Sequence, residues 1–189
     1  MSTASTPELE AQPVTATVSP SIKQAPISCP GHSRPVVDLY FSAESDCGSL
    51  FISAAKDGRA ILRQGDTGDW IGTFIGHQGA VWSCALDYHA TKAATGAADF
   101  TAKLWDTGSG QELLSIAEDH IVRCVDLSKT DSGAFLLTAN NRKELSVYDL
   151  NNATCPVTRV VAHTEIIRRA LWCDMDRHML TASEDATIK

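Results

Sequence analysis

A short polar motif recurs along this chain at a nearly constant interval. The hydroxyl residues that open the motifs SAAKDG, TGAADF, TANNRK and TASEDA are separated by 42, 43 and 43 positions. A period of about 40–45 residues built from short strands is the signature of a four-stranded propeller blade. Each copy reads as strands of about six residues divided by turn clusters such as KDG and DTGSG. The sequence therefore predicts an all-β fold of repeated antiparallel sheets.

The residues around each motif recur as well. A Gly-His or Ala-His pair precedes three of the copies, and an extended run ending in an aromatic residue and Asp follows two of them, as in KLWD. This pattern resembles the WD40 family over residues 29–189. The resemblance implies that a His, a Ser or Thr, a turn Asp and a Trp form one hydrogen-bonded chain, because buried polar groups at a blade edge must be paired. The residues expected in these structural chains are His32, Ser53, Asp57, His77, Thr95, Asp99, Trp105, Thr138, His163, Thr181 and Asp185.

Two copies depart from this pattern. In the first, Arg63 stands where the Trp would fall. In the third, Glu118 takes the His position and Arg142 replaces the turn Asp. A Glu118–Arg142 ion pair could replace the lost His–Asp pair. We favour the alternative, two exposed charges that never meet, since exposed pairs contribute little stability.

A hydrolase triad is the competing interpretation of Ser or Thr with His and Asp. A triad occurs once and needs an exposed nucleophile beside an oxyanion site. Here the constellation repeats with the period of the motif, and the G-x-S-x-G nucleophile elbow is missing from the sequence. We therefore expect a structural role, no catalytic residue and no enzyme activity.

Composition narrows the possible ligands. The net charge is −7, which disfavours a general nucleic-acid or anionic-membrane surface. The six cysteines are scattered without C-x-x-C or zinc-finger spacing, so we expect free thiols, no metal site and no cofactor. Trp82 and Trp172 fall on first strands and are expected in the core. Arg168 and Arg169 should point to opposite faces of a strand, which leaves room for a small partner-binding patch.

The organisation of the chain follows from the repeats. Residues 1–28 are rich in Ser, Thr and Pro and predict a disordered tail. The repeats are expected at about 32–74, 77–116, 118–150 and, truncated, 163–189. Because the family has seven blades and this chain holds about four, we expect a partial, open propeller that corresponds to an N-terminal fragment. Its open edges predict that the chain alone is prone to aggregate.

Finer wording points to one branch of the family. The segment LRQGDTGDWIGTF, with Arg-Gln in place of aromatic-Asp, resembles a group of receptor-associated WD40 scaffolds. That resemblance implies a non-catalytic scaffold of the cytoplasm and nucleus that binds proteins of the SMN complex (Gemin-type subunits), which loads Sm proteins onto spliceosomal RNAs. It also implies binding to TGF-β pathway receptors, which we rank second. No direct contact with nucleic acid, membrane or small-molecule substrate is implied. The alternative is a scaffold like the i subunit of translation initiation factor 3, which shares the wording FIGHQGAVW.

Overall fold

The computed structural model describes residues 26–44, 48–130, 134–152 and 155–189, and the predicted tail at 1–28 lies almost wholly outside them. The described chain is all β, as the repeats predict. Each of the first three sheets is an antiparallel meander of four strands, and the fourth sheet has two. The strands are β1 (Val36–Phe41), β2 (Leu50–Ala55), β3 (Ala60–Gln64), β4 (Trp70–Phe74), β5 (Val81–Leu86), β6 (Lys92–Ala97), β7 (Thr101–Asp106), β8 (Glu112–Ala117), β9 (Val122–Leu127), β10 (Phe135–Asn140), β11 (Glu144–Asp149), β12 (Thr158–Val161), β13 (Ile167–Cys173) and β14 (His178–Ser183).

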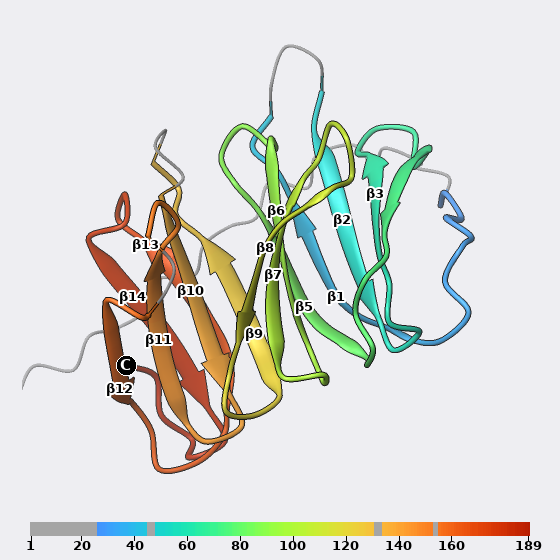
Figure 1. Ribbon diagram of the computed structural model, residues 1–189. Coiled ribbons are helices and arrows are strands. Elements are labelled where there is room, and N and C mark those ends of the chain that lie inside the picture. The colour runs from blue at the N-terminus through green and yellow to red at the C-terminus, as the bar shows by residue number, and fades with distance from the viewer. Residues whose placement is uncertain (1–25, 45–47, 131–133, 153–154) are drawn as a thin grey trace, which may run out of the picture.

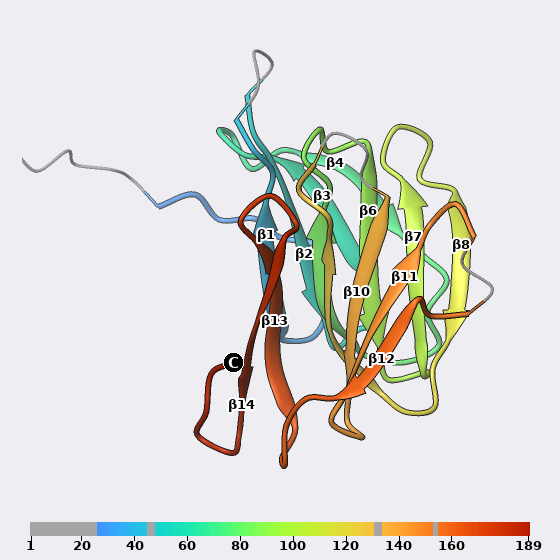
Figure 2. The ribbon, with the colours of Figure 1, turned by 90° about the vertical axis from the view of Figure 1, so that its left-hand side faces the viewer.

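The sheets stand side by side as successive blades of an open propeller (Figure 1). We call β1–β4 blade 1, β5–β8 blade 2, β9–β12 blade 3 and β13–β14 blade 4. The first strand of each blade is innermost, so that β5 packs between β1 and β9, and β9 packs against β13. Figure 2 shows β1 and β13 on the same side of the molecule, with the outer strands fanned away from them. The row of blades curves without closing into a ring.

The hydrophobic core consists of three slabs, one between each pair of neighbouring blades. A central sheet therefore buries both of its faces, and β6 reads as a continuous run of small residues rather than an alternating one. At Gly96 an added Cβ would lie 2.6 Å from a Val122 methyl group in the next blade. The close approach of blades 2 and 3 therefore requires glycine there.

The two ends of the row differ from its middle. Leu39 and Phe41 on β1 are about half exposed, as is Leu180 on β14, because no further sheet among the described residues covers those faces. Blade 3 extends beyond the expected boundary at residue 150, since its outer strand β12 follows at Thr158–Val161.

Candidate functional site

The complete hydrogen-bonded chain lies in blade 2, where four side chains from different elements meet. The indole Nε1–H of Trp105 on β7 donates to Thr95 Oγ1 on β6 at 2.8 Å. Thr95 Oγ1 lies 2.7 Å from His77 Nε2, and His77 Nδ1 lies 2.9 Å from Asp99 Oδ2 in the β6–β7 turn. The donors run in one direction, from Trp105 through Thr95 and His77 to Asp99. We call each such chain of contacts a relay.

The protonation states in this relay follow from its surroundings. Burial lowers the pKa of His77, although Asp99 opposes that effect. Burial would raise the pKa of Asp99, but hydrogen bonds from Thr101, the Gln78 amide and His77 outweigh it and lower the pKa. A neutral imidazole with its proton on Nδ1 and an ionised carboxylate satisfy every hydrogen bond of the relay.

The turn that carries the Asp is set by local sequence. The Asp99 carboxylate accepts from the backbone N–H of Thr101, two residues on, at 3.1 Å. Asp side chains commonly close turns in this way. The residue after the turn position is left-handed in every blade, and only blade 1 fills it with glycine: the φ angles are 83° at Gly58, 66° at Phe100, 70° at Lys143 and 61° at Ala186.

Blades 1 and 4 repeat the His-centred part of the relay. In blade 1, His32 contacts Ser53 Oγ at 2.9 Å and Asp57 Oδ2 at 3.0 Å. In blade 4, His163 contacts Thr181 at 2.8 Å and Asp185 at 2.9 Å.

The position of the missing Trp in blade 1 is filled by a buried arginine. Arg63 is only 3% exposed, and its guanidinium donates to two backbone oxygens, those of Gly68 at 3.2 Å and of Pro30. These two hydrogen bonds connect the segment before β1 to the β3–β4 turn. The sequence shows that Arg63 replaces the Trp, but it does not predict the hydrogen-bond acceptors of Arg63.

Blade 3 builds its relay around a carboxylate. The Glu118 side chain is fully buried, and its Oε1 accepts from Thr138 Oγ1 at 2.7 Å and from the Tyr148 hydroxyl at 3.0 Å. Arg159 on β12 lies 3.5 Å from Glu118 Oε2, and Asn140 donates to the same oxygen at 3.4 Å. Burial, together with the Glu118 charge, raises the pKa of Tyr148 to about 12, so the phenol remains a donor.

The structure corrects both sequence interpretations of Glu118. Glu118 is not an exposed charge, and its cation is Arg159 rather than Arg142. Arg142 is exposed in the β10–β11 turn, and its backbone N–H is held by Asn140 Oδ1 at 2.9 Å. Asn140, which lies two residues before Arg142, thus takes over the turn-closing role of the missing Asp.

A comparison with known families agrees with this geometry. Residues 68–106, which include β6, β7 and the TGAADF turn, match the family described as "WD domain, G-beta repeat". This chain carries a WD40 repeat.

The chain is also similar to curated proteins. It is 52% identical over 169 residues to the human serine-threonine kinase receptor-associated protein, covering 89% of this chain and 47% of the relative. It is 46% identical over 147 residues to the Dictyostelium discoideum protein of that name, covering 78% and 50%. Eukaryotic translation initiation factor 3 subunit I of Drosophila mojavensis is 30% identical over 167 residues, with 84% and 51% covered. The chain spans about half the length of the curated relatives it matches.

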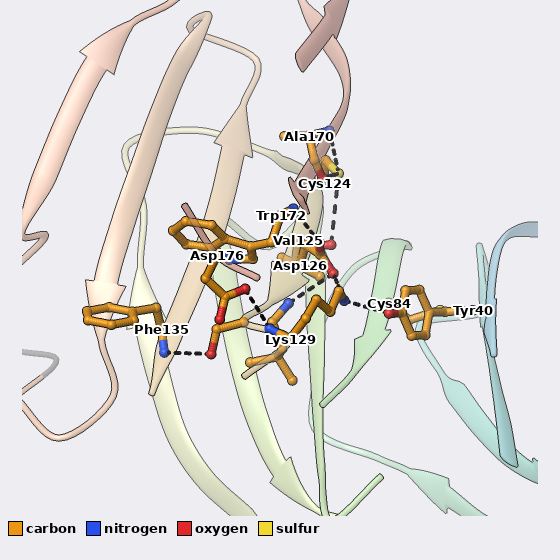
Figure 3. A network of polar contacts seen from close by, with 12 residues as sticks. Tyr40, Cys84, Cys124, Val125, Asp126, Lys129, Phe135, Ala170, Trp172 and Asp176 are labelled. Carbon is orange, nitrogen blue, oxygen red and sulfur yellow. Dashed lines mark hydrogen bonds and ion pairs between the residues drawn. The ribbon is translucent and has the colours of Figure 1, made fainter. Parts of the chain in front are cut away.

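The WD40 blades are also joined along their inner strands by a contact that sequence reasoning missed. The third residue of β1, of β5 and of β9 accepts a backbone N–H from the next blade. Asp38 accepts from Cys84 N at 3.1 Å, and Ser83 accepts from Val125 N at 3.2 Å. The thiol of Cys124 accepts from Ala170 N at 3.2 Å (Figure 3). The only signal in the sequence is that these acceptors occupy equivalent positions near the repeat period.

Two ionic contacts add to these joints. Arg169 on β13 reaches Asp38 on β1 at 2.7 Å, which links the first and last blades. Lys129 bridges Asp126 at 2.6 Å and the Tyr40 hydroxyl at 2.5 Å (Figure 3). Asp126 in turn accepts from Trp172 N at 2.8 Å. The inner strands therefore carry a continuous polar network among blades 1, 3 and 4.

The WD40 relays have the residue types of a catalytic triad but not its accessibility. The Thr95 hydroxyl belongs to a residue with no exposed surface, and Ser53 and Thr181 are at most 5% exposed. A substrate cannot approach these oxygens without unfolding the blade, so the relays hold strands together and offer no nucleophile.

Within 26–44, 48–130, 134–152 and 155–189, no three His, Cys, Asp or Glu side chains gather as metal ligands. Over the same ranges, the structure contains no helical segment with the length and apolar character of a bilayer span.

Proposed function

We propose that this chain is a non-catalytic scaffold that binds proteins during the assembly of RNA–protein complexes. The observation that carries the proposal is the 52% identity to the serine-threonine kinase receptor-associated protein over most of the chain. The fold supports it, because the repeated relays are buried and leave the loops at the blade ends free to vary. Propellers host many functions, so the choice among scaffolds rests on the relatives rather than on the fold.

The specific assembly that we propose is the SMN complex, with Gemin-type and Sm proteins as partners in the cytoplasm and nucleus. The distinctive segment around QGDTGDW supports this choice over other scaffolds of the family. The name of the relatives also speaks of association with a serine-threonine kinase receptor, and we place regulation of TGF-β receptors second.

A second candidate is a scaffold like translation initiation factor 3 subunit I. It is favoured by 30% identity over 84% of this chain. The lower identity places it behind the first candidate.

Affinity purification separates the two candidates. A tagged copy of the 189-residue chain, expressed in cells of its own source, is expected to recover Sm and Gemin-type proteins identified by mass spectrometry. Thr95→Ala, which destabilises blade 2, should recover less, and Arg142→Ala, an exposed change, should recover as much as the unaltered chain. Recovery of initiation-factor subunits instead would favour the second candidate. Recovery of neither set would contradict the proposal.

A further inference from the structure

A cleft opens where the four inner strands begin. Its lining comes from the second residue of each strand, Val37, Trp82, Arg123 and Arg168, and its volume is about 250 Å³. Trp82 is half-buried and lies outside the three core slabs, contrary to the expectation that it packs in the core. Arg168 faces the cleft whereas Arg169 points to Asp38, so the adjacent arginines do take opposite sides of β13.

Two cations make cation–π contacts with the Trp82 ring, one from the blade on each side. The Arg123 guanidinium of blade 3 lies 4.2 Å from the ring centroid, and the Lys56 ammonium of blade 1 lies 5.3 Å from it. Cation–π contacts of this kind hold a charged head in place without neutralising it. Trp82 therefore positions two positive charges beside the cleft.

Among the described residues no Asp or Glu forms an ion pair with Arg123 or Lys56. Two carboxylates are engaged by other groups, Asp57 by His32 and Glu184 by Arg168, which itself lines the cleft. Burial and then the neighbouring Arg168 charge lower the pKa of Arg123, and the Glu184 carboxylate opposes them.

The positive surface continues beside this cleft. Lys56 also lines a second, polar hollow of about 400 Å³ between blades 1 and 2, together with Arg34. Arg34 is exposed and, within the described chain, has no carboxylate in ion-pair contact. On a chain of net charge −7, this run of cations is a local reversal of sign.

We propose that the cleft at Trp82 binds an acidic peptide segment of a partner protein, with its carboxylates on Arg123 and Lys56. Tryptophan and arginine are the residues that most often dominate protein–protein binding energy, and an anion here restores the missing charge pairing. The proposal rests on the scaffold function above and specifies the chemistry of one of its partners.

A protein partner fits this site better than a nucleic acid. Base stacking needs a free aromatic face, and the Trp82 ring is already flanked by Lys56 and Arg123. A long polyanion would also meet the overall negative charge of the chain, whereas a short acidic segment meets only the local cations.

Fluorescence anisotropy with synthetic probes tests the proposal on the 189-residue chain. The probe is a fluorescein-labelled decapeptide of alternating Glu and Gly, and its control has Gln in place of Glu. The acidic peptide should bind, more weakly as salt increases, and the Gln peptide should not. Arg123→Gln should weaken binding about tenfold, equivalent to about 1.4 kcal/mol. The matched control Arg177→Gln removes an exposed cation at the opposite end of β13 and should bind as the unaltered chain does.

The remaining outcomes overturn the proposal. They are failure of the acidic peptide to bind, equal effects of Arg123→Gln and Arg177→Gln, and tighter binding of a labelled ten-nucleotide uridine RNA than of the peptide. Thermal melts of both variants establish that each is folded. Affinity purification keeps the two proposals apart, because Sm and Gemin-type proteins recovered equally by the unaltered chain and by Arg123→Gln would leave the scaffold function standing while this cleft is ruled out.

Discussion

Blades 2 and 3 solve the same packing problem with different chemistry. In blade 2 a neutral imidazole, His77, connects a threonine to an aspartate, and Trp105 completes the relay. In blade 3 a carboxylate, Glu118, accepts from a threonine and a tyrosine at the equivalent places. The fold therefore requires an acceptor for the β-strand hydroxyl, and it tolerates either a neutral or a charged one.

The difference lies in what each relay needs around it. The His77 relay is nearly neutral at its centre and ends on a carboxylate at the turn. The Glu118 relay places its charge at the buried centre and needs Arg159 from the outer strand. Removing Glu118 leaves two buried donors, the hydroxyls of Thr138 and Tyr148, without their acceptor, so blade 3 should be the more sensitive of the two.

The largest effect is expected for Glu118→Ala. It removes the acceptor of two buried hydroxyls, those of Thr138 and Tyr148, at a cost of about 3 kcal/mol of unfolding free energy, while Arg159 keeps Asp119 at 2.9 Å. Urea denaturation followed by circular dichroism measures it. Glu118→Gln keeps an acceptor and should cost about half as much. Equal costs for the two variants would show that the charge of Glu118 is unimportant.

The next effect contrasts the two threonines. Thr95→Ala removes the acceptor of Trp105 Nε1 and the partner of His77, and should cost about 2 kcal/mol. Thr138→Ala removes only one donor to Glu118, which keeps Tyr148 and Asn140, and should cost about 1 kcal/mol. The measurement is again the urea midpoint. A larger loss for Thr138→Ala would reverse the comparison.

Acidification should weaken blade 2 by a smaller amount. Because the His77 pKa is lowered, the stability that neutral His77 contributes to blade 2 is complete above about pH 6.5 and declines as pH falls below that value. A lowered Asp99 pKa means that its contribution holds above about pH 4 and declines below that value. Stability measured from pH 7 to pH 3 should therefore fall in both intervals, and Asp99→Asn should lose the lower one. An NMR titration of His77 with a midpoint above 6.5 would contradict the first part.

The smallest effect is expected for Arg142→Ala. Arg142 occupies the position of the turn Asp, but its side chain is exposed and the turn is held through Asn140. The free energy of unfolding should change by less than about 0.5 kcal/mol. Asn140→Ala is the matched change that does remove the turn contact. A loss above 1 kcal/mol for Arg142→Ala would mean that Arg142 contributes an interaction after all.

The strands, the turns and the relay positions could be predicted because the residues that form them lie close together in the sequence. Strands of about six residues, tight turns and the His, Ser or Thr and Asp positions all recur near one period, and neighbouring strands of a meander are adjacent in sequence. The contacts of His77, Thr95 and Asp99 span at most 22 residues, within one repeat.

The remaining features depend on contacts that the repeat pattern of the sequence does not predict. Arg159 lies 41 residues beyond Glu118 on an outer strand that the repeat boundaries left out. An aromatic residue on an inner strand predicts core packing, yet Trp82 lines the cleft and its ring contacts cations of two other blades. The inner-strand acceptors are not predictable from residue type, because aspartate, serine and cysteine share no obvious chemical identity.

That variety has a consequence for how such a molecule can change over time. At every inner-strand joint the donor is a main-chain N–H, which no substitution short of proline removes. The side chain of the donor residue therefore takes no part in the bond. The acceptor position can hold any small side chain with a lone pair, as Asp38, Ser83 and Cys124 do. A duplicated or exchanged repeat would form the same hydrogen bond between its main-chain N–H and the acceptor of the neighbouring blade. Duplication of a repeat therefore needs no new contact between blades.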